Sequence, residues 1–115
     1  MPVRVKRVYE QPADADGYRV LVDRLWPRGV SREGAHLDEW ARDLAPSSEL
    51  RRWFGHDPGR FAEFRCRYLA ELEHREEQVR ELRRRARRGT VTLVYSARDT
   101  EHNDAVVLAE LLRRR

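Results

Sequence analysis

The chain has 115 residues, 24 of them basic and 20 acidic, with a net charge of +4, and a length below about 200 residues predicts one domain spanning residues 1–115. Its single cysteine, Cys66, excludes an internal disulfide, and its four histidines stand in no metal-ligand spacing, so no metal site is predicted. There is neither an apolar run of about 18 residues nor an apolar signal segment, so we expect a cytoplasmic protein without membrane spans.

Two strands are predicted near the N-terminus. Val3 and Val5 alternate with polar neighbours, and the β-branched run at residues 18–23 indicates a buried second strand, with a turn between the two strands. The second strand leads into residues 24–29, which include Pro27 and Gly29. Because proline cannot donate to a sheet ladder and glycine permits a positive φ, we expect a shaped loop there.

The next segment mixes short elements. Residues 31–34 form a turn or one helical turn, and residues 35–41 favour a short strand. Residues 45–54 then predict a short helix, since Ser47 or Ser48 can accept hydrogen bonds from its free N–H groups.

A longer helix is expected to begin at Asp57 and Pro58. Asp57 is a typical N-cap residue, and proline is typical of the first helical position. Its apolar face comprises Phe61, Phe64, Tyr68 and Leu72. The stripe then loses apolar residues, so we expect a break at residues 74–76 before the helix resumes and ends at Gly89. We expect Cys66 to be a small buried apolar residue rather than a nucleophile.

Residues 90–95 are the clearest strand, followed by a final helix that Asp99 or Thr100 caps. The apolar face of this helix comprises Ala105, Leu108, Ala109 and Leu112. Helices interspersed between strands favour an α/β fold, a single three-layer-like domain with a small, mostly parallel sheet flanked by helices.

Ligands of open α/β sheets usually bind beyond the carboxyl ends of strands. Two loops fit that description, at residues 23–29 and 95–103, and they meet if their strands are parallel neighbours. The candidate ligand-binding residues are Asp23, Arg24, Trp26, Arg28, Tyr95, Ser96, Arg98, Asp99 and Asn103.

The chemistry of these side chains favours a small anionic, phosphate- or nucleotide-like ligand. The guanidinium groups of Arg24, Arg28 and Arg98 can form bidentate contacts to phosphate or carboxylate. Trp26 and Tyr95 can supply an aromatic wall for a planar group.

A structural alternative uses the same loops. In that interpretation Asp23 pairs with Arg24 or Arg98 and joins the two loops, and Asp99 is only a helix cap.

Whether the protein is an enzyme stays open. The catalytic candidates are Asp23, Ser96, Asp99 and His102. Ser96 follows a strand but lacks the GxSxG frame of a nucleophile elbow. A position of His102 in the first helical turn would lower its pKa and suit a neutral base, although an exposed surface histidine is the simpler interpretation. No cofactor or oligomeric state follows from the sequence.

Two other function classes compete with a small-ligand site. Lys6 is the only lysine, and the arginine-rich segments 83–88 and 113–115, with Arg51 and Arg52, are candidates for binding nucleic acid. Because acids are interleaved with these cations, a solvated surface is favoured instead. The third class is a structural or interaction protein, in which Trp40, Trp53 and Phe54 form a partner patch rather than core.

Five ordered motifs carry a family resemblance. They are VLVDRLWPRG at residues 20–29, DEW at 38–40, LAPS at 44–47, LRRWF at 50–54 and TLVYSARD at 92–99, with Asn103. With them the chain resembles the YeaO-like proteins, the short branch of the domain-of-unknown-function family 488 (DUF488). The resemblance covers nearly the whole chain and implies an α/β single domain without an established activity. Longer members carry a cysteine after the last strand and a Cys-His-Arg triplet opening the next helix, where this chain has Ser96 and His102-Asn103, which argues against thiol chemistry.

Overall fold

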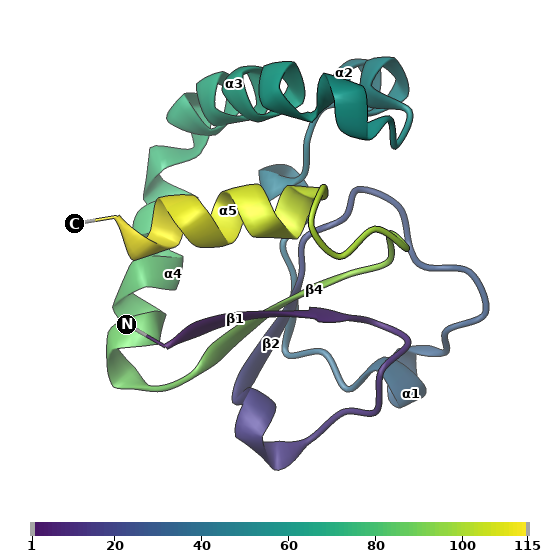
Figure 1. Ribbon diagram of the computed structural model, residues 1–115. Helices are drawn as coiled ribbons and strands as arrows, with labels where there is room; N and C mark the ends of the chain where they lie inside the picture. Colours follow the sequence, from purple (N-terminus) through teal and green to yellow (C-terminus); the bar gives the residue numbers. More distant parts are fainter. Residues whose placement is uncertain (1, 115) are drawn as a thin grey trace.

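The computed structural model describes residues 2–114, which form four β-strands and five α-helices (Figure 1). The strands are β1 (Val3–Arg7), β2 (Tyr18–Leu21), β3 (Glu39–Trp40) and β4 (Val91–Tyr95). The helices are α1 (Arg32–Ala35), α2 (Ser48–Phe54), α3 (Phe61–Leu72), α4 (Glu76–Arg88) and α5 (Asp104–Arg113). Short 3₁₀ turns lie at Asp14–Asp16, Arg42–Leu44, Pro58–Arg60 and Glu73–Arg75. The expected α/β class is confirmed.

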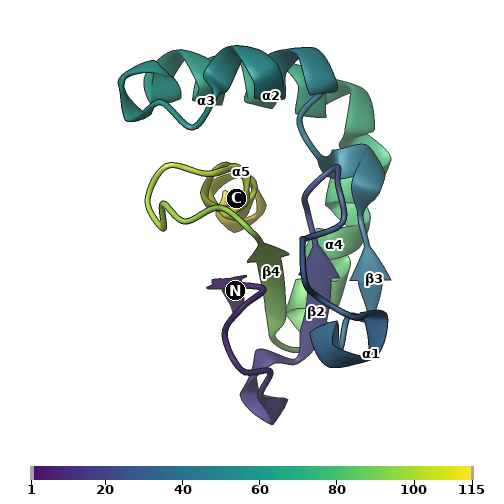
Figure 2. The ribbon, with the colours of Figure 1, turned by 90° about the vertical axis from the view of Figure 1, so that its right-hand side faces the viewer.

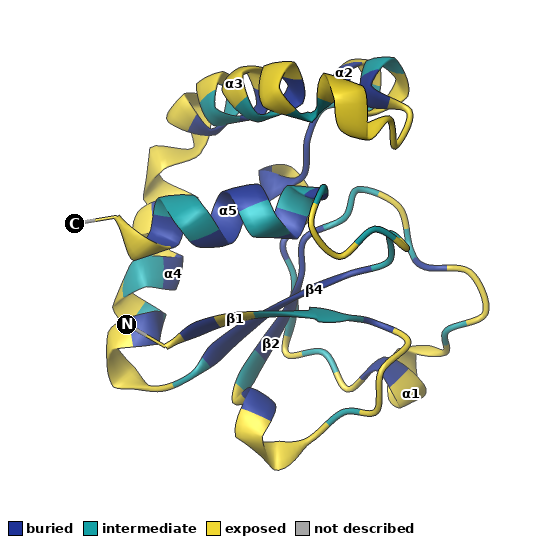
Figure 3. Ribbon diagram, viewed as in Figure 1, coloured by how far each residue is buried: buried dark blue, intermediate teal, exposed yellow. Residues whose placement is uncertain are grey.

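The sheet has the order β1-β4-β2-β3, and all its strand pairs are parallel. The last strand in the chain, β4, therefore lies between the first two, and its Leu93 is the register partner of both Val5 and Val20. This central strand is buried along its whole length (Figure 3). Because β2 and β4 are parallel neighbours, the loops that follow them leave the sheet at the same edge.

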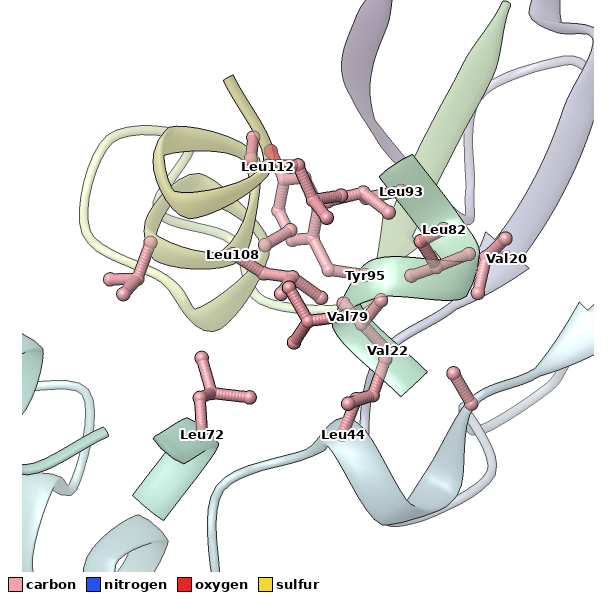
Figure 4. Close-up of a cluster of buried hydrophobic side chains, with 14 of the residues drawn as sticks. Val20, Val22, Leu44, Leu72, Val79, Leu82, Leu93, Tyr95, Leu108 and Leu112 are labelled. Carbon is pink, nitrogen blue, oxygen red and sulfur yellow. The ribbon is translucent and has the colours of Figure 1, made fainter. Parts of the chain in front are cut away.

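The main core lies on one face of the sheet. There α5 packs on β1 and β4, and α3 packs on α5, which gives successive layers of sheet and helices (Figure 2). Leu93 and Leu108 are fully buried in this core (Figure 4). A smaller cluster on the opposite face contains Leu21 and Val94 and is covered by α1 and its neighbouring loops. Strand alternation explains the division, since successive side chains point to opposite faces.

Most of the expected helix boundaries are confirmed. Ser47 caps α2 by accepting a hydrogen bond from the Leu50 N–H at 3.1 Å. Gly55 ends α2 in the left-handed conformation, with φ 53°. The expected break between the two long helices is the 3₁₀ turn Glu73–Arg75.

The prediction for Cys66 was wrong, because this side chain is exposed. α3 buries Phe64, Tyr68 and Leu72. At about 100° per residue, Cys66 lies roughly 200° around the helix from Phe64 and faces away from the core.

A buried ion pair lies at the amino ends of β2 and β4. Asp16 and Arg19 are 4% and 3% exposed, and Asp16 Oδ2 lies 2.6 Å from Arg19 Nη1. Lys6 Nζ contacts the same carboxylate at 3.1 Å. Arg19 also donates to the Ala35 carbonyl at 3.0 Å, so this pair ties β2 to α1.

Within residues 2–114, no helix is long and apolar enough to cross a membrane.

Candidate functional site

Asp23 joins the two loops that follow β2 and β4. Its Oδ2 accepts hydrogen bonds from the Ser96 N–H at 2.9 Å and from the Ser96 hydroxyl at 2.7 Å. Its carbonyl accepts a third from the Trp40 indole N–H at 2.7 Å. Among the described residues Asp23 forms no ion pair, so the expected pairing with Arg24 or Arg98 is wrong. The joining of the two loops that this alternative expected is confirmed, with Ser96 as the partner.

A cavity of about 320 Å³ lies between these loops, α2 and the start of α5. Of the predicted ligand-binding residues, the cavity is lined by Asp23, Arg24, Trp26, Arg28, Ser96 and Asn103. Tyr95, Arg98 and Asp99 do not line it. The lining also contains residues that sequence reasoning had not placed in the pocket, among them Tyr9, Arg51, Phe54 and Asp104. His56, in the loop between α2 and α3, is part of the lining too.

The arginines of the cavity differ in how they are held. Arg24 Nε donates to the Pro46 carbonyl at 3.0 Å, which fixes the loop after β2 against the start of α2. Arg28 and Arg51 are exposed, and within residues 2–114 their side chains have no hydrogen-bond or salt-bridge partner. Two guanidinium groups from different elements are therefore available to a ligand, while the third is committed to the fold.

Asp104, the first residue of α5, is the main site residue that sequence reasoning missed. Its Oδ1 accepts a hydrogen bond from the Ala105 N–H at 2.8 Å, and it lines the same cavity as Asp23. Burial and the neighbouring negative charge of Asp23 raise the pKa of Asp104 well above its ordinary value. Asp104 therefore keeps its proton to higher pH than an isolated aspartate does. An acid in the first turn of a helix is common because it interacts favourably with the helix dipole. Nothing in the sequence therefore singled out Asp104 as a site residue.

We expect Asp104→Asn to be more stable than the wild type at pH 7, by about 1 kcal/mol or more. A carboxyl whose pKa rises on folding loses its contribution to stability as pH rises through that folded pKa. The amide keeps the shape of the carboxyl and can donate to Asp23 without a desolvated charge. Urea unfolding between pH 4 and 8 measures the difference, which should vanish near pH 4.

The exposed acid Glu101 supplies the control for this prediction. Glu101→Gln should follow the wild type across the whole pH range, because surface substitutions change stability by less than about 0.5 kcal/mol. If Asp104→Asn is less stable than the wild type at pH 7, the folded protein does not disfavour the charged form of Asp104.

The cap of α5 is Asn103, so the prediction of Asp99 or Thr100 was wrong. Asn103 Oδ1 accepts from the Val106 N–H at 2.9 Å, and its Nδ2 donates to the Asp99 carbonyl at 2.9 Å. Asn103 has the required side-chain acceptor one residue before the helix begins.

Asp99 organises the turn that precedes α5. Its Oδ1 accepts from the Glu101 and His102 N–H groups, and its Oδ2 lies 2.9 Å from His102 Nδ1. The hydrogen bond from the Glu101 N–H and the contacts with His102 lower the pKa of Asp99. His102 thus precedes the helix, and the expectation of a place in its first turn was wrong.

Tyr95 and Arg98 are not part of the cavity lining. Tyr95 is buried in the main core beside Leu108 and Leu112, and this burial raises the pKa of its hydroxyl (Figure 4). Arg98 is exposed and makes no side-chain hydrogen bond within the part of the chain that the structure describes. Trp26, whose indole N–H donates to the Val30 carbonyl at 2.7 Å, forms the aromatic wall with Phe54 instead.

Among the described residues Ser96 forms no hydrogen bond with a histidine. The Ser96 hydroxyl donates to a carboxylate, and the partner of the His102 ring is Asp99. Residues 2–114 also contain no group of three or more His, Cys, Asp or Glu side chains placed to hold a metal ion. What the geometry offers is a cavity with two available guanidinium groups beside the carboxyls of Asp23 and Asp104.

Comparison with known proteins gives one family and several close relatives. Residues 2–115 match the model of the family DUF488-N3i, described as "Inactive DUF488-N3 subclade". The chain is 46% identical over 113 residues to "Uncharacterized protein YeaO" of Escherichia coli (strain K12), which covers 98% of each chain. It is 47% identical over 113 residues to "Uncharacterized protein Rv3073c" of Mycobacterium tuberculosis (strain ATCC 25618 / H37Rv), covering 98% of this chain and 95% of the relative. No solved structure matches it.

Proposed function

Because the chain belongs to the DUF488-N3i family, a subclade described as inactive, we propose that it binds a small anionic molecule without converting it. The observation that carries this proposal is the pair Arg28 and Arg51. They come from different elements, line one cavity, and have no side-chain partner among residues 2–114.

The chemistry of the cavity supports an anion with an oxygen-rich group. A guanidinium presents a planar fork of donors that matches phosphate and carboxylate oxygens. The volume of about 320 Å³ is in the range of small-molecule pockets, and the apolar surfaces of Trp26 and Phe54 can cover the less polar part of a ligand.

The state of Ser96 supports binding over catalysis. The resemblance to the wider family implies that its longer members carry a cysteine in the region where this chain has Ser96. Here both the N–H and the hydroxyl of Ser96 donate to Asp23. A hydroxyl held by a carboxylate in this way positions the loop, and the His102 ring is paired with Asp99 rather than with Ser96.

A thermal-shift screen tests the proposal with phosphate, sulfate, sugar phosphates and nucleotides. A ligand at about 100 times its Kd stabilises the folded protein by roughly 2.7 kcal/mol. We expect this stabilisation in the wild type and expect Arg28→Ala and Arg51→Ala each to lose most of it.

The matched control is Arg98→Ala, which removes an exposed arginine outside the cavity. This variant should respond to anions as the wild type does. If no anion raises the melting temperature, or if Arg98→Ala loses as much stabilisation as Arg28→Ala, the cavity is not the anion site.

The arginine-rich helix α4 gives less support to nucleic-acid binding. Arg83 donates to the Leu111 carbonyl at 2.8 Å, and Arg85 lies over the Tyr18 ring at 3.8 Å. Arg84 pairs with Glu81. These cations are used within the fold, which leaves fewer of them for phosphates. Arg115 lies outside the described residues.

The aromatic residues give equally little support to a partner patch. Phe54 is buried, and Trp53 is covered by Arg60 and Arg67, at 5.4 and 4.4 Å from its ring. A partner would first have to displace both side chains.

A further inference from the structure

Tyr9 and Leu25 are the exposed large apolar side chains of the described region, and both line the cavity. They are 49% and 53% exposed. Exposed apolar groups gathered at one place often mark a binding site, whereas isolated ones are normal on any surface. Their common position at the rim of one pocket therefore points to a ligand with an apolar part.

The surroundings of Tyr9 hold its ring in place. Its hydroxyl donates to the Arg28 carbonyl at 3.0 Å, and the Arg7 guanidinium lies 5.0 Å from the ring centre. Arg7 is itself fixed, because its Nε donates to the Ala97 carbonyl at 2.8 Å. The ring is thus anchored at its hydroxyl and supported by Arg7, while half of its surface stays open.

This anchored ring lies in the same cavity as the free arginines. Tyr9 follows β1, Ser96 and Ala97 follow β4, and Arg28 follows β2, so the ends of three adjacent strands contribute to one pocket. The Tyr9–Arg28 hydrogen bond also connects the ring directly to the loop that carries an available guanidinium.

We propose that the ligand is a nucleotide-type molecule, in which a planar ring stacks on Tyr9 and a phosphate contacts Arg28 and Arg51. The proposal rests on the proposed anion-binding function and adds the class of ligand. Planar bases stack on aromatic side chains with little dependence on base identity. An anchored tyrosine loses little conformational freedom when a ring stacks on it, which favours binding.

Titration calorimetry tests this with matched probes: AMP, GMP, CMP, UMP, ribose 5-phosphate and inorganic phosphate. We expect the tightest nucleotide to bind at least about tenfold more strongly than ribose 5-phosphate, the same molecule without a base. Tyr9→Ala should remove this difference, so that nucleotides and ribose 5-phosphate bind to this variant with similar affinity. Tyr9→Phe retains the ring and should retain most of the preference.

The controls separate this inference from the anion site. Arg28→Ala and Arg51→Ala should lower the affinity for nucleotides and for ribose 5-phosphate alike. Arg98→Ala should lower neither affinity. If ribose 5-phosphate binds through Arg28 and Arg51 as tightly as every nucleotide, stacking is refuted and the anion site stands. If no probe binds, both proposals fail. If only oligonucleotides bind, with a steep loss at high salt, the ligand is a nucleic acid and the proposal is overturned.

Discussion

Asp16→Ala is expected to lower the free energy of unfolding by about 3 to 5 kcal/mol. The substitution leaves the Arg19 guanidinium, only 3% exposed, without its carboxylate 2.6 Å away. Breaking a buried pair from one side is more harmful than replacing both partners, because an uncompensated charge stays buried. Denaturant unfolding of the wild type and the variant at pH 7 measures this loss.

The matched control is Asp14→Ala, an exposed acid in the same 3₁₀ turn. It should change stability by less than about 0.5 kcal/mol. A loss below about 1 kcal/mol for Asp16→Ala would mean that water reaches Arg19 and replaces the carboxylate.

The same pair has a defined pH dependence. Burial alone would raise the pKa of Asp16, but hydrogen bonds from the Ala13 N–H, Lys6 and Arg19 outweigh it and lower that pKa. A carboxylate with a lowered pKa contributes stability above the unfolded-state value of about 3.9, and this contribution is lost as pH falls through the folded pKa. The difference between the wild type and Asp16→Ala should therefore shrink in acid and stay constant between pH 5 and 8.

Gly17→Ala is expected to lower the free energy of unfolding by about 3 kcal/mol. Gly17 has φ 63° and ψ −129°, a region that residues with a Cβ rarely adopt. A Cβ at this position would lie 2.3 Å from the Thr90 carbonyl oxygen. That oxygen accepts the Tyr18 N–H at 2.9 Å, so moving it would also disturb the first contact between β2 and β4.

Two other glycines separate the causes of this effect. Gly29 has φ 72° and no atom within 4 Å of an added Cβ, so Gly29→Ala should cost only about 1 to 2 kcal/mol of backbone strain. Gly89 is extended and equally open, so Gly89→Ala should stay within about 0.5 kcal/mol of the wild type. Equal losses for Gly17→Ala and Gly29→Ala would show that the steric clash at Thr90 is relieved.

The loops of the candidate site could be found from the sequence because strand signals are local. The runs that become β2 and β4 are β-branched and apolar, and each ends in polar and charged residues. The rule that ligands bind beyond strand ends then selected the two loops, and the parallel pairing of β2 with β4 brings Asp23 to Ser96. Tyr9, which follows β1, was missed although the same rule applies to it.

Other site residues depend on contacts that a local pattern does not contain. Asp104 faces Asp23 only because α5 begins beside the loop after β2. Arg51 reaches the cavity because Arg24 holds that loop against the start of α2. Cys66 matches the spacing of an apolar face, yet α3 turns a different face to the core.

By itself the sequence determined the fold class, the main helices and strands, and the edge of the sheet at which a site would lie. These follow from periodicity and capping, which act over a few residues. Only the tertiary structure decided which charged side chains share the cavity. Arg24 and Arg98 look alike as loop arginines, but one is hydrogen-bonded to backbone carbonyls and the other faces outward. The direction of a side chain is set by packing between elements far apart in the chain, and local residue preferences do not encode it.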